Sequence, residues 1–255
     1  MNKKLLSFLF LAVLATVTIY SCKKADDDTD TTTDVSNDYF PLQVGKYIIY
    51  NVDSTIWDES VCLKVGKHFQ MMYIVADTFT DAMGRPSYRI DRRIRKETED
   101  QWVQHDVLYV TKTPKTMEWS QDNFRYIKLT FPVTENATWK GNAYIQAADT
   151  PISYFAGWDY NYTGVDKPFN VGEITYDQTV TVNQVDVAVN DPETLPRAHA
   201  SRTFGKEVYS KGLGLVYREY YHWTYDPTSP ANVDTFHTER CRLGAGVIMR
   251  AVDHN

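Results

Sequence analysis

Two stretches of this chain alternate between apolar and polar side chains with a period of two, as a β-strand with one buried face does. In the first, Tyr88, Ile90 and Ile94 share one parity, while charged residues dominate the other. In the second, residues 213–225, the odd-numbered positions read Leu, Leu, Tyr, Glu, Tyr, Trp and Tyr. We expect the charged side of the first strand to face solvent and the odd-numbered side of the second to face the core.

Further runs rich in Tyr, Val, Thr and Ile are bounded by Asn, Asp, Gly and Pro, as strands are. These runs cover residues 46–52, 71–79, 102–111, 124–133, 144–148, 173–189, 202–209 and 247–252. Eighteen tyrosines and six tryptophans can fill a core while their OH and NH groups reach its wet edge. Together these features predict an all-β, antiparallel fold with a strongly curved sheet or partly closed barrel. A proline after Thr150 could open a short helix, and we expect at most one or two such pieces.

The chain begins like a bacterial signal peptide. Lys3 and Lys4 precede an apolar run at 5–19, which is too short for a confident membrane span, and the small residue Ser21 comes just before Cys22. This arrangement resembles the lipobox of bacterial lipoproteins, which implies cleavage between Ser21 and Cys22 and acylation of Cys22. The alternatives are an ordinary secretory signal or an uncleaved anchor helix, with Cys22 an incidental thiol.

An acidic segment follows this cysteine. Residues 23–34 hold five aspartates among threonines, with almost no apolar surface, which is the composition of a disordered tether. Acidic residues in this position resemble the surface-export signal of Bacteroidetes lipoproteins, although a merely soluble linker has the same composition. We therefore expect a signal peptide at 1–21, a tether at 22–37 and a single β-rich domain at 38–255, anchored at the outer membrane or cell surface.

The charge of the mature chain bears on its partners. Removing residues 1–21 leaves 255 − 21 = 234 residues, and the loss of two lysines leaves 25 basic against 33 acidic side chains, a net charge of −8. Such a chain gains no counterion-release affinity for a phosphate backbone, so nucleic acid is disfavoured. The expected partners are the membrane, through the lipid, and an unknown ligand or envelope protein.

Cys62 and Cys241 remain if Cys22 carries lipid. A disulfide between them would close a long loop and contribute about 4 to 5 kcal/mol in the chain-entropy model. Two separate buried thiols, acting as small apolar residues, fit the sequence equally well.

Motifs for catalysis or metal binding are not found in the sequence. The six histidines lack zinc-enzyme spacing, and His222 and His237, even if they faced each other across a hairpin, would be too few ligands. Nucleophile-elbow, phosphate-loop and dinucleotide motifs are also absent. We therefore predict no cofactor, no metal and no catalytic residue.

Four blocks of the chain resemble uncharacterised lipoproteins of the Bacteroidetes. They are Tyr39–Gly45, Tyr176–Gln184, Glu207–Glu219 and Met249–Asn255. The resemblance covers most of the mature chain. It implies the lipid anchor and the β-rich fold, and it brings no activity, ligand or catalytic residue.

These observations favour a lipid-anchored, non-catalytic binding domain for a glycan, lipid, peptide or envelope partner. One alternative is a hydrolase with a dispersed active site, which would show a concave pocket with two or more convergent titratable groups. Another is a structural envelope component, which would show a flat exposed apolar patch. Tryptophans exposed in a cleft would favour ligand binding. The candidate ligand contacts are Trp57, Trp102, Trp139, Trp158 and Trp223.

Overall fold

The computed structural model describes residues 33–34, 38–147, 152–233 and 240–255. Residues from Thr32 to Asn255 form one compact unit. Ser21, Cys22 and His237 lie outside the described residues, so the predictions made for them stay predictions.

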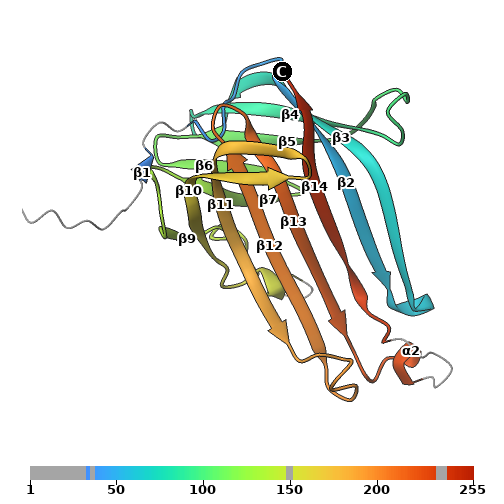
Figure 1. Ribbon diagram of the computed structural model, residues 1–255. Coiled ribbons are helices and arrows are strands. Elements are labelled where there is room, and N and C mark those ends of the chain that lie inside the picture. The colour runs from blue at the N-terminus through green and yellow to red at the C-terminus, as the bar shows by residue number, and fades with distance from the viewer. Residues whose placement is uncertain (1–32, 35–37, 148–151, 234–239) are drawn as a thin grey trace, which may run out of the picture. The chain divides into compact units, whose positions relative to one another are not determined.

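Twelve strands form one antiparallel sheet (Figure 1). In spatial order they are β7 (Phe124–Thr130), β6 (Thr116–Gln121), β5 (Val103–Lys112), β4 (Pro86–Arg95), β3 (Leu63–Thr80), β2 (Tyr47–Asp58), β14 (Leu243–His254), β13 (Gly214–Tyr225), β12 (Ala200–Ser210), β11 (Ile174–Val189), β10 (Asp159–Val171) and β9 (Thr138–Lys140). The last strand, β14, pairs with β2 and β13, and so joins two runs of sequential hairpins. A separate two-stranded pair, β1 (Thr33–Asp34) with β8 (Val133–Thr134), places part of the predicted tether beside the domain.

The two edges of this sheet approach each other. The Ile127 N–H donates to the carbonyl oxygen of Gly141 at 2.8 Å, and Trp139 Nε1 donates to the Ile127 carbonyl oxygen at 2.8 Å. The sheet is therefore nearly closed into a barrel, which confirms the predicted fold class. Helical structure in the described ranges consists of α2 (Pro230–Val233) and the 3₁₀ turns η1 (Glu59–Val61) and η2 (Ser153–Phe155). None of it is long and apolar enough to cross a membrane.

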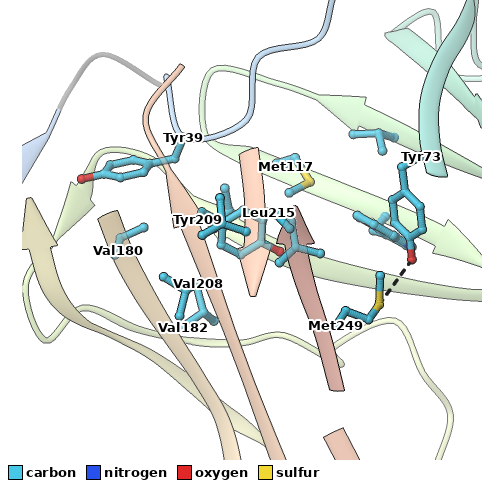
Figure 2. Packing of buried hydrophobic residues seen from close by; sticks show 14 of the residues in the cluster. Tyr39, Tyr73, Met117, Val180, Val182, Val208, Tyr209, Leu215 and Met249 are labelled. Atoms are coloured by element: carbon cyan, nitrogen blue, oxygen red, sulfur yellow. Dashed lines mark hydrogen bonds between the residues drawn. The ribbon is translucent and has the colours of Figure 1, made fainter. Parts of the chain in front are cut away.

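The core fills the inside of the curved sheet. Figure 2 shows Tyr209, Val182 and Leu215 packed together, with Tyr73 and Met249 further along the interior. Buried tyrosines satisfy their hydroxyls internally; that of Tyr50, for example, donates to the Leu215 carbonyl oxygen at 2.8 Å. The last four residues of β11 are exposed, and β3 is buried only in its middle, so these long strands extend beyond the core.

The predicted core side of strand β13 was wrong over most of its length. Val208 pairs with Tyr217 but Tyr209 pairs with Leu215, so Val216 is an extra residue in a β-bulge. Both Leu215 and Val216 are therefore buried. From Arg218 to His222 the even-numbered residues face the interior, because a one-residue shift exchanges the two faces of a strand.

The strand predicted at 144–148 was also wrong where the structure describes it. Residues 141–147 form turns, in which the Ile145 N–H donates to the Asn142 carbonyl oxygen at 2.9 Å. The Asn142 side chain donates to the Phe155 carbonyl oxygen and accepts from the Tyr160 hydroxyl, and these bonds tie the turn to η2 and β10. Strands β6, β9 and β10 were not predicted.

A disulfide joins Cys62 to Cys241, which are 179 residues apart in sequence. Cys62 follows η1 between β2 and β3, and Cys241 comes just before β14. The bridged form is thus the one present in the structure, and it ties two neighbouring strands together at one end.

Candidate ligand-binding cavity

A cavity of about 280 Å³ lies inside the curved sheet. Its wall comes from β6 and β7 on one side and from η2, β10, β11 and β13 on the other. Most of the lining side chains are aromatic, including Trp119, Tyr126, Trp158 and Tyr220. An aromatic hollow with a few convergent polar groups is the usual form of a small-molecule site.

A buried cluster of charges forms part of this wall. Lys128 Nζ donates to Glu207 Oε1 at 2.7 Å, and Arg218 Nε lies 3.6 Å from the same oxygen. The hydroxyl of Tyr209 donates to Glu207 Oε2 at 2.7 Å. Lys128 is 5% exposed and Glu207 is 1% exposed. Lys128 and Arg218 line the cavity, whereas Glu207 lies behind them.

The curvature of the sheet brings this cluster together. Glu207 in β12 and Arg218 in β13 are direct cross-strand partners, so their side chains share the inner face. Lys128 comes from β7, at the opposite end of the strand order, and reaches Glu207 across the interior. The ion pair therefore exists only because the sheet curls until its two halves face each other.

Electrostatics keeps Glu207 and Arg218 ionised. Burial alone would raise the pKa of Glu207, but the adjacent charges of Lys128 and Arg218 outweigh it and hold that pKa below its usual range. Burial lowers the pKa of Lys128, although Glu207 opposes this shift. Burial also raises the pKa of Tyr126 to about 12, so its hydroxyl stays protonated. With Lys128 protonated, two cations against one carboxylate give the cluster a net charge of +1.

Gln184 projects from a β-bulge into the same cavity. Asn183 pairs with Lys206 and Val185 pairs with Gly205, which leaves Gln184 as the unpaired residue between them. A Cβ atom on Gly205 would lie 3.0 Å from Gln184 Oε1, so the glycine makes room for the amide. Gln184 is only 4% exposed, yet its Nε2 has no hydrogen-bond partner in the described protein. Buried donors of this kind are rare and need an explanation.

The 3₁₀ turn η2 separates the cavity from a second hollow of about 440 Å³. Tyr154, Trp158 and Gln184 line both spaces. The Tyr154 ring stacks on the His222 imidazole with 3.8 Å between ring centroids. His222 Nδ1 is also hydrogen-bonded to Thr203 Oγ1 at 2.8 Å, and burial lowers the His222 pKa.

The structure does not bring the five predicted tryptophans together. Trp158 lines the cavity and is 6% exposed. Trp139 packs on Tyr162 near the closing edge of the sheet, and Trp102 lies under the Arg95 guanidinium, 4.4 Å from its ring centroid.

Trp57 and Trp223 share a shallow groove of about 460 Å³. Glu219 and Tyr221 also line this outer groove. Since they alternate with Arg218, which lines only the cavity, the groove lies on the opposite face of the sheet from the cavity.

The cavity does contain convergent titratable groups, which was the stated mark of a hydrolase. Its only deeply buried carboxylate, Glu207, already accepts from Lys128 and Tyr209 and is held ionised, so it is poorly placed to exchange protons with a substrate. The carboxylate that does line the cavity, Asp122, is exposed and accepts from Gln121 at 2.9 Å. This arrangement suits electrostatic binding better than acid–base catalysis. Within the described ranges, no group of three His, Cys, Asp or Glu could hold a metal ion.

Sequence reasoning did not single out Lys128, Gln184 or Arg218. A charged residue on the core-facing side of a strand would mark Arg218 as a candidate site residue. Because the predicted core side of β13 was the wrong one, this signal was missed. A bulged residue such as Gln184 leaves no mark in the hydrophobic pattern.

Comparison with known proteins adds little. No family model and no curated protein matches this chain. One solved structure, an exported protein of Bacteroides fragilis with a YmcC-like fold, is 11% identical and has a TM-score of 0.36 over 84% of this chain and 98% of that one. Likeness at this TM-score supports no inference about function.

Proposed function

We propose that this protein is a binding protein of the cell envelope, anchored by lipid on Cys22, that takes a small ligand into the cavity between β7 and β13. The signal-like start and the acidic segment after Cys22 support the location. The buried amide of Gln184, aimed into an aromatic cavity and left without a partner, is the observation that carries the binding role. A ligand that accepts from Gln184 would complete its hydrogen bonding.

The anchor is tested by replacing Cys22 with alanine. We expect the wild-type chain in the membrane fraction and the Cys22→Ala chain in the soluble fraction, because no acyl chain can then be attached. Metabolic labelling with palmitate should mark only the wild type, because the variant lacks the cysteine that would be acylated. Stable anchoring takes more than one acyl chain. Membrane retention of the unlabelled variant would refute the lipid anchor.

The binding site is tested by filling the cavity. Gln184→Trp places an indole in the hollow, whereas Val189→Trp adds the same group to an exposed position on the same strand. Two fluorescent probes of similar ring structure serve as ligands: 1-anilinonaphthalene-8-sulfonate and the neutral N-phenyl-1-naphthylamine. We expect saturable binding of at least one probe by the wild type and by Val189→Trp, and its loss in Gln184→Trp at unchanged thermal stability. Absence of binding to the wild type would refute the small-molecule cavity.

A further inference from the structure

We infer that the ligand of this cavity is a compact ring compound that carries one negatively charged oxygen group, such as a carboxylate. This inference rests on the proposed function and adds the ligand's chemical class. It follows from three features of the cavity wall: its charge, its unused donors and its aromatic shape.

The wall has a surplus of positive charge. Lys128 and Arg218 both face the cavity, while the single carboxylate that compensates them, Glu207, lies behind them. Both oxygens of Glu207 are already hydrogen-bonded, Oε1 to Lys128 and Oε2 to Tyr209. The carboxylate that lines the wall itself, Asp122, is exposed to solvent. A ligand with one negative charge would make the buried part of the site neutral, and buried charges are stable only when they are compensated.

The wall also offers hydrogen-bond donors that a ligand could use. Gln184 Nε2 and Arg218 Nε are both buried without a hydrogen-bond partner in the described protein. Lys128 Nζ makes one hydrogen bond, to Glu207, and an ammonium group has three protons to donate. Hydrogen bonds from such donors to an ionised oxygen are roughly twice as strong as those between neutral groups. An anionic acceptor therefore uses this wall better than a neutral one.

The ring follows from the remaining surface. Lys128 Nζ lies 5.0 Å from the Tyr126 ring centroid and 5.9 Å from that of Trp119, so aromatic faces surround the cationic centre. Trp158 and Tyr220 add further rings, 6.3 Å apart between centroids. Flat aromatic faces pack well against a sugar or an aromatic ring. A flexible chain would lose more conformational entropy on entering the same space.

The two probes test the charge preference directly, because they share their rings and differ in the sulfonate group. We expect the wild type to bind the sulfonate probe at least about tenfold more tightly than the neutral one, as one charge-assisted hydrogen bond implies. Gln184→Glu exchanges the unused donor for a carboxylate of the same size and should abolish this preference. Gln184→Met, the matched neutral variant, should reduce sulfonate binding but keep the preference, since Lys128 and Arg218 remain.

Competition against the sulfonate probe identifies the ring. Displacement by D-glucuronate but not D-glucose would indicate a sugar acid, and displacement by benzoate but not benzamide would indicate an aromatic acid. Equal binding of both probes to the wild type, or an unchanged preference in Gln184→Glu, would overturn the inference and leave the proposed binding role intact. Binding of neither probe would instead refute the binding role itself.

Discussion

The cavity and the outer groove lie on opposite faces of one curved sheet and share strand β13. Both are rich in aromatic rings, yet their charges are arranged differently. In the outer groove Arg202 is paired with Asp186 at 2.6 Å, and Arg242, which stacks on Trp223, is paired with Glu193 at 3.0 Å. A third cation, Lys64, lies 5.8 Å from the Trp57 ring centroid. In the cavity two cations share the one carboxylate of Glu207. Half-buried tryptophans are therefore a poor guide to a binding site. Unused donors alone do not distinguish the two surfaces either, because Arg242 Nε is also buried without a hydrogen-bond partner in the described protein. The buried carboxylate shared by two cations is what distinguishes the cavity.

The two surfaces also differ in how they are built. The outer groove depends on missing side chains, since Gly246 leaves room for the Tyr221 side chain, which would lie 2.8 Å from an added Cβ atom. The cavity depends on the curvature of the sheet, which brings β7 to face β12. Changes in one surface should therefore leave the other largely intact, and each of the following predictions tests this independence.

The largest effect is expected from removing the carboxylate of the cavity cluster. Glu207→Gln leaves the buried Lys128 and the half-buried Arg218 without a counter-charge and should lower the free energy of unfolding by about 3 to 5 kcal/mol. Asp53→Asn is the matched change on the other face, where Asp53 is paired with Arg250 at 2.6 Å but is half exposed. This control should cost less than about 1 kcal/mol. Urea unfolding measures both, and equal losses would show that burial does not distinguish the two sites.

The sequence predicted the sheet better than the cavity. Period-two patterns locate β4 and β13 because each strand meets a core on one face only. Strand β10 escaped prediction because Gly164, Asp166 and Pro168 read as loop residues; in the structure Gly164 and Asp166 take positive φ where the pairing with β11 shifts register. The sequence alone does not show whether such residues end a strand or are accommodated within it at a β-bulge.

The cavity escaped prediction for a different reason. Lys128 and Glu207 are 79 residues apart and meet only when the sheet closes, so no local pattern connects them. The same holds for Cys62 and Cys241, whose pairing the sequence left open because it gives no distance between the two Cα atoms, which are 4.6 Å apart in the structure.

Loss of the disulfide is expected to have the next largest effect. The double variant Cys62→Ser with Cys241→Ser should lower the free energy of unfolding by about 2 to 5 kcal/mol, since the unfolded chain regains the freedom of a long loop. The bridge joins the ends of β2 and β14, which carry the outer groove and do not line the cavity. Binding of the sulfonate probe at a temperature where the variant is folded should therefore be unchanged. A parallel loss of probe binding would contradict the independence of the two surfaces.

A smaller loss is expected from adding one methyl group beneath the outer groove. In Gly244→Ala the new Cβ atom would lie 2.1 Å from the His222 carbonyl oxygen, so the backbone of β13 or β14 must move. We expect a cost of about 1 to 3 kcal/mol, typical of overpacking. Gly66→Ala in β3 is the control, because its nearest atom, the Ser54 carbonyl oxygen, is 3.9 Å away. If both variants unfold at the same urea concentration, close packing between β13 and β14 is not what requires glycine at position 244.

The smallest effect is expected on lowering the pH. The two faces should lose stability in different pH ranges, His222 on the inner face and Asp53 on the outer face. Burial lowers the pKa of His222, so the unfolded chain binds a proton there more readily than the folded one. Stability from neutral His222 is thus complete above the ordinary pKa of about 6.5 and is lost as the pH falls from that value toward the lower folded pKa.

On the other face, a hydrogen bond from His68 and the nearby Arg250 lower the pKa of Asp53. That contribution is lost only below the ordinary aspartate pKa of about 3.9. His222→Gln should therefore flatten the decline in unfolding free energy just below pH 6.5, whereas Asp53→Asn should not; urea titrations at a series of pH values measure this. An unaltered slope in His222→Gln would mean that this imidazole keeps its ordinary affinity for protons in the folded protein.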